Sequence, residues 1–135
     1  MKALMPDISD PSTQERLSPS AILLFANIME AWGVVDLDAA YLLGDIPLET
    51  YRAFRAGSDT VRLGEELLTR ISYTIGIYKA IQIVHGRELA DKWVHLPNTN
   101  RLFNGSTPLR YMIQEGVPAM QNVRRLLDAR AAGNY

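Results

Sequence analysis

Three arginines and a threonine lie within a short stretch of the sequence, at Thr50, Arg52, Arg55 and Arg62. Arginine and threonine side chains donate hydrogen bonds to DNA phosphates and base edges. On a helix that enters the major groove, Thr50, Arg52 and Arg55 would form the polar face, and Arg62 would be available for a phosphate. The sequence therefore predicts these four residues as candidate DNA contacts.

A second basic group lies towards the end of the chain, at Arg124, Arg125 and Arg130. Such residues can be a solvated helix face, or they can pair with the anionic groups of a partner. Residues 87–135 hold 7 basic and 4 acidic residues, a net charge of +3, whereas residues 1–86 hold 7 and 11, a net charge of −4. The two parts of the chain are therefore suited to different electrostatic partners.

Residue types that perform catalysis or bind metals are sparse. The chain has no cysteine and two histidines, too few for a typical structural zinc site. His85 and His95 have no suitably spaced partner, so both are interpreted as structural. The sequence also lacks a phosphate-binding glycine loop and the metalloprotease, serine hydrolase and EF-hand motifs. We expect a protein that is not an enzyme and that binds no metal or cofactor.

Length and composition indicate an ordinary globular chain. It has 135 residues, of which 47% are hydrophobic and 21% are charged, and we expect one domain or two small ones. Residues 1–17 lack the apolar run of a signal peptide, and no apolar stretch approaches the roughly 20 residues of a membrane span. We expect a flexible segment over 1–17, a cytoplasmic location and no membrane partner.

The hydrophobic pattern is helical along the whole chain. Apolar residues recur every three or four positions, and no stretch alternates with the period of a strand. In the first helix, Ser18 is predicted to cap, Pro19 to occupy the first turn and Gly33 to mark the end. The predicted fold class is all-α, with about seven helices at 18–32, 37–43, 47–56, 60–84, 87–96, 107–115 and 118–131.

The two short helices predicted on either side of Gly44 have the shape of a helix-turn-helix, in which the second helix lies in the major groove. Two features weaken this interpretation. The turn is one residue longer than usual, and Asp45 and Glu49 place negative charge where phosphates would approach. A helical scaffold that only looks like a DNA-binding motif is the alternative.

The helix predicted over 60–84 is apolar around most of its circumference in its second half. A chain of this length has few other elements to cover both sides, so we expect a homodimer with Ile77, Ile81 and Val84 in its interface. Gly76 lies in the same helix, where it costs about 1 kcal/mol relative to alanine and allows another helix to approach closely.

An ordered set of residues runs through the last third of the sequence: Trp93, Pro97-Asn98, Phe103, Gly105, Pro108-Leu109, Gly116, Val123-Arg124-Arg125 and Leu127-Asp128-Ala129. In this order and combination, the set resembles the C-terminal toxin-binding domain of the Xre/MbcA/ParS antitoxin family. Residues 30–60 look like the Xre-type helix-turn-helix that precedes this domain in the family, and the resemblance covers about residues 20–135. It divides the chain into a helix-turn-helix and dimerisation region at 18–86 and a toxin-binding domain at 87–135.

The resemblance implies a type II antitoxin that forms a homodimer, inhibits a toxin and represses its own operon by binding operator DNA. The implied toxin is a RES-domain protein that consumes NAD+, or an ADP-ribosyltransferase as in the ParS branch. Candidate toxin contacts are Arg124, Arg130, Asn134 and Tyr135. Gly133 can turn the last two residues off the helix axis, and the aromatic ring of Tyr135 suits a nucleotide pocket. The alternatives are a stand-alone helix-turn-helix regulator and a small helical enzyme.

Overall fold

The computed structural model describes residues 7–57 and 62–133, and within these ranges it contains six α-helices, one short 3-10 helix and no strand. The predicted all-α class is therefore confirmed. The elements are α1 (Pro11–Ala31), α2 (Asp36–Leu42), α3 (Leu48–Ala56), α4 (Glu65–Trp93), η1 (Arg101–Phe103), α5 (Pro108–Glu115) and α6 (Val117–Ala131). No helix among the described residues is long and apolar enough to cross a bilayer.

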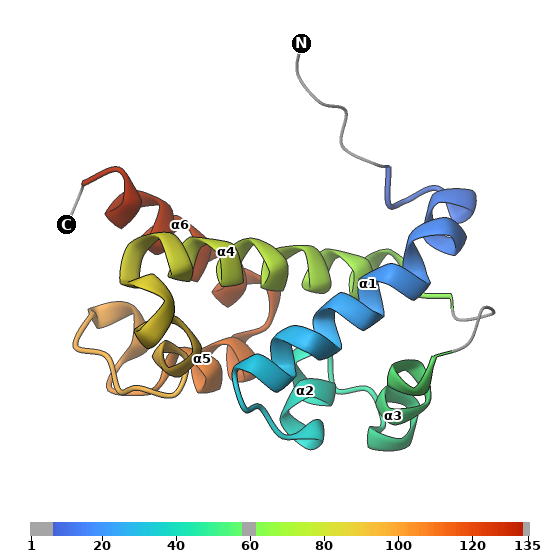
Figure 1. The fold of residues 1–135 in the computed structure, drawn as a ribbon, viewed down its shortest axis with the longest axis horizontal. Coiled ribbons are helices and arrows are strands. Elements are labelled where there is room, and N and C mark those ends of the chain that lie inside the picture. Colours follow the sequence, from blue (N-terminus) through green and yellow to red (C-terminus); the bar gives the residue numbers. More distant parts are fainter. Residues whose placement is uncertain (1–6, 58–61, 134–135) are drawn as a thin grey trace, which may run out of the picture.

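The long helix α4 runs along the length of the molecule, and α1 and α6 pack against it (Figure 1). Its first part contacts α1, and the Trp32 ring after α1 lies 6.1 Å from the ring of Tyr78 on α4. Helix α4 also contacts α6, and α2 and α3 pack against each other beside α1. The helix-turn-helix-like pair therefore meets the rest of the chain through contacts of α3 with α1 and of α2 with α5.

Gly86 divides α4 into two helical parts. Its backbone has φ 74° and ψ 173°, a conformation that almost only glycine adopts, so the helix turns sharply at this residue. The sequence places a break at the same residue, between the helices predicted over 60–84 and 87–96. The prediction of about seven helices therefore agrees with the structure once the two parts of α4 are considered separately.

The predicted start of the first helix is wrong. Helix α1 begins at Pro11, and the Asp10 carboxylate caps it by accepting a hydrogen bond of 3.0 Å from the Thr13 backbone N–H, so residues 11–17 are helical. Pro19 lies inside the helix, although proline is usually tolerated only in the first turn. Ser18 does not cap but is buried, and its hydroxyl accepts a hydrogen bond of 2.7 Å from the Leu63 N–H.

The hydrophobic core is one continuous cluster that extends from α1 to α6. Ile77 and Ile81, which were predicted as dimer contacts, are fully buried in this core, and Val84 is partly buried against it. The wide apolar stripe of α4 is covered by helices of the same chain, so Ile77 and Ile81 are not available to a second copy. Trp93 is buried in the same core, and its ring packs edge-on against Phe103.

Candidate functional site

The predicted DNA-contacting residues are arranged along α3 and the segment that follows it. Arg52 and Arg55 are exposed on α3, Thr50 is half-buried in its first turn, and Arg62 is exposed before α4 begins. Helices α2 and α3 are joined by a turn in which Gly44 and Asp45 both have positive φ values, 99° and 57°. The helix pair expected from the sequence is therefore present.

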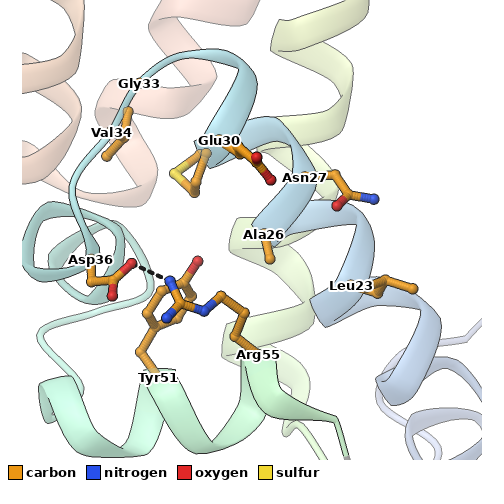
Figure 2. A pocket seen from close by; sticks show the side chains of 10 residues that line it. Leu23, Ala26, Asn27, Glu30, Gly33, Val34, Asp36, Tyr51 and Arg55 are labelled. Atoms are coloured by element: carbon orange, nitrogen blue, oxygen red, sulfur yellow. Dashed lines mark hydrogen bonds and ion pairs between the residues drawn. The ribbon is translucent and has the colours of Figure 1, made fainter.

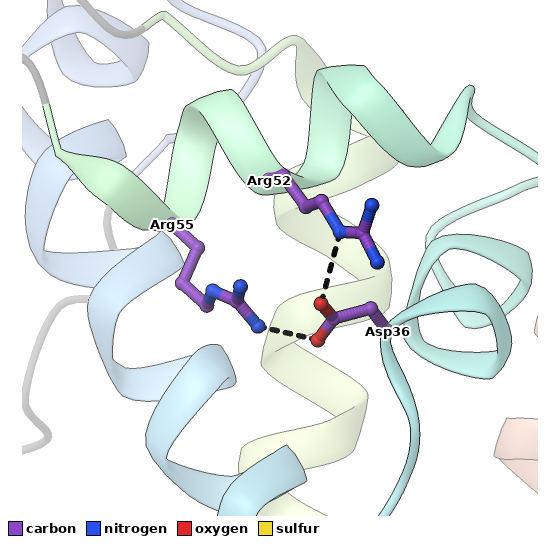
Figure 3. Close-up of polar contacts among 3 residues, drawn as sticks. All are labelled: Asp36, Arg52 and Arg55. Carbon is purple, nitrogen blue, oxygen red and sulfur yellow. Dashed lines mark hydrogen bonds and ion pairs between the residues drawn. The ribbon is translucent and has the colours of Figure 1, made fainter.

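Both arginines of α3 bind the same carboxylate, that of Asp36 in the first turn of α2 (Figure 3). The Arg52 Nε lies 3.2 Å from Asp36 Oδ2, and the Arg55 Nη1 donates to Oδ1. Burial by itself would raise the pKa of Asp36, but hydrogen bonds and positive charge from the two arginines outweigh it and leave the pKa below its usual value. The carboxylate is therefore ionised at neutral pH, and the pairing is lost only as the pH falls through this lowered pKa.

A pocket of about 450 Å³ lies next to this ion pair, between α1, α2 and α3 (Figure 2). Arg55 and Asp36 line one side, and the Arg55 guanidinium lies 5.8 Å from the centre of the Tyr51 ring. Tyr51 is buried, which raises the pKa of its phenol. Among the described residues no group of three or more potential ligands could hold a metal ion. Of the charged groups that line the pocket, Asp36 and Arg55 bind each other.

Helices α4 and α6 run parallel and share the most extensive contact of any two helices in the described ranges. The Gln121 side-chain amide donates to the Tyr73 hydroxyl at 3.2 Å, and three residues further along each helix Arg124 lies over Gly76. The Arg124 Nε also donates to both carboxylate oxygens of Asp128, at 3.0 and 3.1 Å. Gly76 therefore allows the close approach that the sequence suggests, and Arg124 occupies the space.

Arg130 lies further along α6, near His85 at the end of the first part of α4. The His85 ring stacks on Trp93, with 5.7 Å between ring centroids. Burial and, to a lesser extent, the positive charge of Arg130 lower the pKa of His85, so its ring is neutral at neutral pH. Arg124 and Arg130 are six residues apart, which separates them by about 9 Å along the helix and by about a third of a turn around it. They are two separate basic positions on α6.

Asn134 and Tyr135, the remaining predicted toxin contacts, lie outside the described residues. Gly133 has φ 83°, and its N–H donates to the Arg130 carbonyl at 3.0 Å. The left-handed conformation expected at this glycine is confirmed.

Two polar contacts that the sequence does not reveal join the α2–α3 pair to the rest of the chain. The Arg70 side chain of α4 is largely buried and donates to the Leu42 carbonyl at the end of α2, at 3.2 Å. Arg110 of α5 forms an ion pair of 3.0 Å with Asp38 of α2. These partners are 28 and 72 residues apart, so no local pattern could have indicated them.

Comparisons with known proteins identify the C-terminal part of the chain. Residues 79–133 match the family model of the antitoxin Xre/MbcA/ParS C-terminal toxin-binding domain. The chain is also 30% identical over 126 residues to the uncharacterized protein y4oB of Sinorhizobium fredii, an alignment that covers 93% of this chain and 95% of y4oB. No solved structure matches. The family match begins within α4 and includes Arg124, Asp128 and Arg130.

Proposed function

This chain belongs to the protein family that carries the Xre/MbcA/ParS C-terminal toxin-binding domain, and from that membership we propose that it is the antitoxin of a type II toxin–antitoxin system. The match over residues 79–133 is the observation that carries the proposal. The net charge of +3 over residues 87–135 and the basic positions on α6 support a partner with acidic groups at its binding surface. The proposed partner is a RES-domain toxin that consumes NAD+, with an ADP-ribosyltransferase toxin as the second candidate.

Co-expression with the products of the adjacent reading frames tests this function. We expect one of these products to arrest growth when it is expressed alone, and we expect this chain to restore growth and to co-purify with that product. A stand-alone transcriptional regulator would do neither. If no adjacent product is toxic, or if this chain neither rescues growth nor binds the toxic product, the proposal is wrong.

For the mechanism of inhibition, we propose that Asn134 and Tyr135 enter the substrate pocket of the toxin. The positive φ of Gly133 supports this proposal, because a glycine in this conformation commonly ends a helix. A chain that ends at Ala132 should still bind the toxin but should no longer inhibit NAD+ consumption. Full inhibition by this shortened chain would mean that steric cover by the rest of the domain is sufficient.

The second proposed activity is repression of the operon through α2 and α3. The pairing of Arg52 and Arg55 with Asp36 and the net charge of −4 over residues 1–86 predict weak DNA binding by a single copy. We therefore expect operator binding to require dimers or toxin-bridged assemblies. Replacement of Arg52 and Arg55 by alanine should abolish the operator shift and leave toxin neutralisation intact. Loss of both activities in a folded double variant would contradict this division.

A further inference from the structure

The Arg124 side chain of α6 crosses Gly76 of α4 and occupies the space that a side chain at this position would fill. A methyl group at Gly76 would overlap the Arg124 Nη1 and would lie 3.1 Å from its Cζ. No other glycine in the described ranges is so closely covered by a side chain. The atoms concerned are the far end of a flexible side chain, so a Cβ at this position would displace the guanidinium and would not separate the helices.

The contact that fixes Arg124 comes from Asp128, one turn further along α6. Asp128 accepts hydrogen bonds from the Nε of Arg124, and this leaves both Nη groups free of any hydrogen bond within the described part of the chain. The Arg124 side chain is 42% exposed. The guanidinium thus lies in the space that Gly76 leaves open, is held by Asp128 and still presents unused donors at the surface.

We infer that Gly76 and Asp128 are positioning residues that hold the Arg124 guanidinium ready to receive a carboxylate of the toxin. This inference rests on the proposed function, because it assigns the contact to the surface by which the chain would bind its partner. A guanidinium is planar and binds a carboxylate through two parallel hydrogen bonds, so its orientation determines how well the partner fits. An arginine that is fixed beforehand also loses less side-chain entropy on binding.

The test combines substitutions of Gly76 and Arg124 with affinity measurements by isothermal titration. The probe is a catalytically inactive form of the proposed RES-domain toxin, taken as the toxic product that the co-expression experiment identifies. We expect Arg124→Ala to weaken binding about tenfold, as is typical for an arginine that contributes strongly to an interface. Gly76→Ala should have a similar effect although it removes no polar group. Arg125→Ala is the matched control on the neighbouring exposed arginine and should change the affinity little.

The double variant Gly76→Ala/Arg124→Ala separates positioning from a general structural effect. If Gly76 acts through Arg124, the double variant should bind as Arg124→Ala does, with no further loss. Gly76→Ala should remain folded, since alanine favours the helix interior by about 1 kcal/mol over glycine. In the free protein, the NMR signal of the Arg124 Nε–H should shift in Gly76→Ala and in Asp128→Ala.

The outcomes separate this inference from the proposed function. If the wild-type chain does not bind the probe, the proposed function is wrong for this partner and the inference is wrong with it. If the wild-type chain binds and Gly76→Ala binds equally well, positioning by Gly76 is wrong while the proposed function stands. The same conclusion follows if Gly76→Ala weakens binding as much in the Arg124→Ala background as it does in the wild-type chain. An Arg124 Nε–H signal that is unchanged in Gly76→Ala would contradict the inference without reference to any toxin.

Discussion

At the scale of single residues, Asp36 determines how the basic side chains of α3 are presented. Val35 occupies the cap position of α2, and Asp36 in the first turn binds Arg52 and Arg55. These partners are 16 and 19 residues away, so the contact depends on how α2 and α3 pack. The basic residues could be found from the sequence, whereas their neutralising partner could not.

Asp36→Asn should strengthen binding of the chain to operator DNA. The substitution releases both arginines, and exposed ion pairs of this kind are worth up to about 1 kcal/mol, so we expect an increase of about two- to fivefold at low salt. Asp45→Asn removes the same charge from the neighbouring turn without releasing either arginine and serves as the control. Titrations followed by fluorescence anisotropy would measure both. Equal affinities of the two variants would show that Asp36 does not restrain Arg52 and Arg55.

At the scale of the elements, hydrophobic spacing and glycine positions identify the helices well. The break at Gly86, the end of α6 before Gly133 and the short pair α2 and α3 all follow from the sequence. The start of α1 does not, because Pro19 in the interior of a helix looks like the first turn of one. Ile77 and Ile81 are buried in the structure, although in the sequence they look unpartnered. The periodicity of apolar residues shows that a helix face is apolar but not which other helix covers it.

Gly86 should be needed for the turn within α4. Its φ of 74° and ψ of 173° lie in a region that is closed to other residues, so Gly86→Ser should lower the free energy of unfolding by about 1–3 kcal/mol. Gly64→Ser is a matched control, since Gly64 has φ −75° at a helix N-cap where serine is favoured, and it should leave stability unchanged or slightly higher. Urea unfolding monitored by circular dichroism compares the two. Similar stabilities of both variants would mean that the turn does not depend on glycine.

At the scale of the whole molecule, self-association must use side chains that remain exposed in one chain. An apolar groove of about 350 Å³ lies between α1 and α4, lined in part by Leu17, Ala21, Leu24 and Ile75. Because the lining is apolar and open to solvent in a single chain, we propose this groove as the homodimer surface in place of Ile77 and Ile81.

Sedimentation at micromolar concentration should therefore give the mass of two chains, and Leu24→Glu should reduce it to the mass of one. Leu37→Glu is the control, because Leu37 is 46% exposed and Leu24 is 45% exposed, but Leu37 does not line the groove. A wild-type protein with the mass of one chain would contradict the homodimer. Dissociation by both substitutions would place the interface elsewhere.

The central claim, that this chain inhibits a toxin through its C-terminal domain, is tested most directly by the rate of NAD+ consumption. The purified toxin from the adjacent reading frame would be titrated with the full chain, and NAD+ would be followed over time. We predict that consumption stops at a fixed ratio of the two proteins, and that Arg124→Ala requires about tenfold more protein for the same effect. Undiminished NAD+ consumption in the presence of excess wild-type chain would contradict the claim.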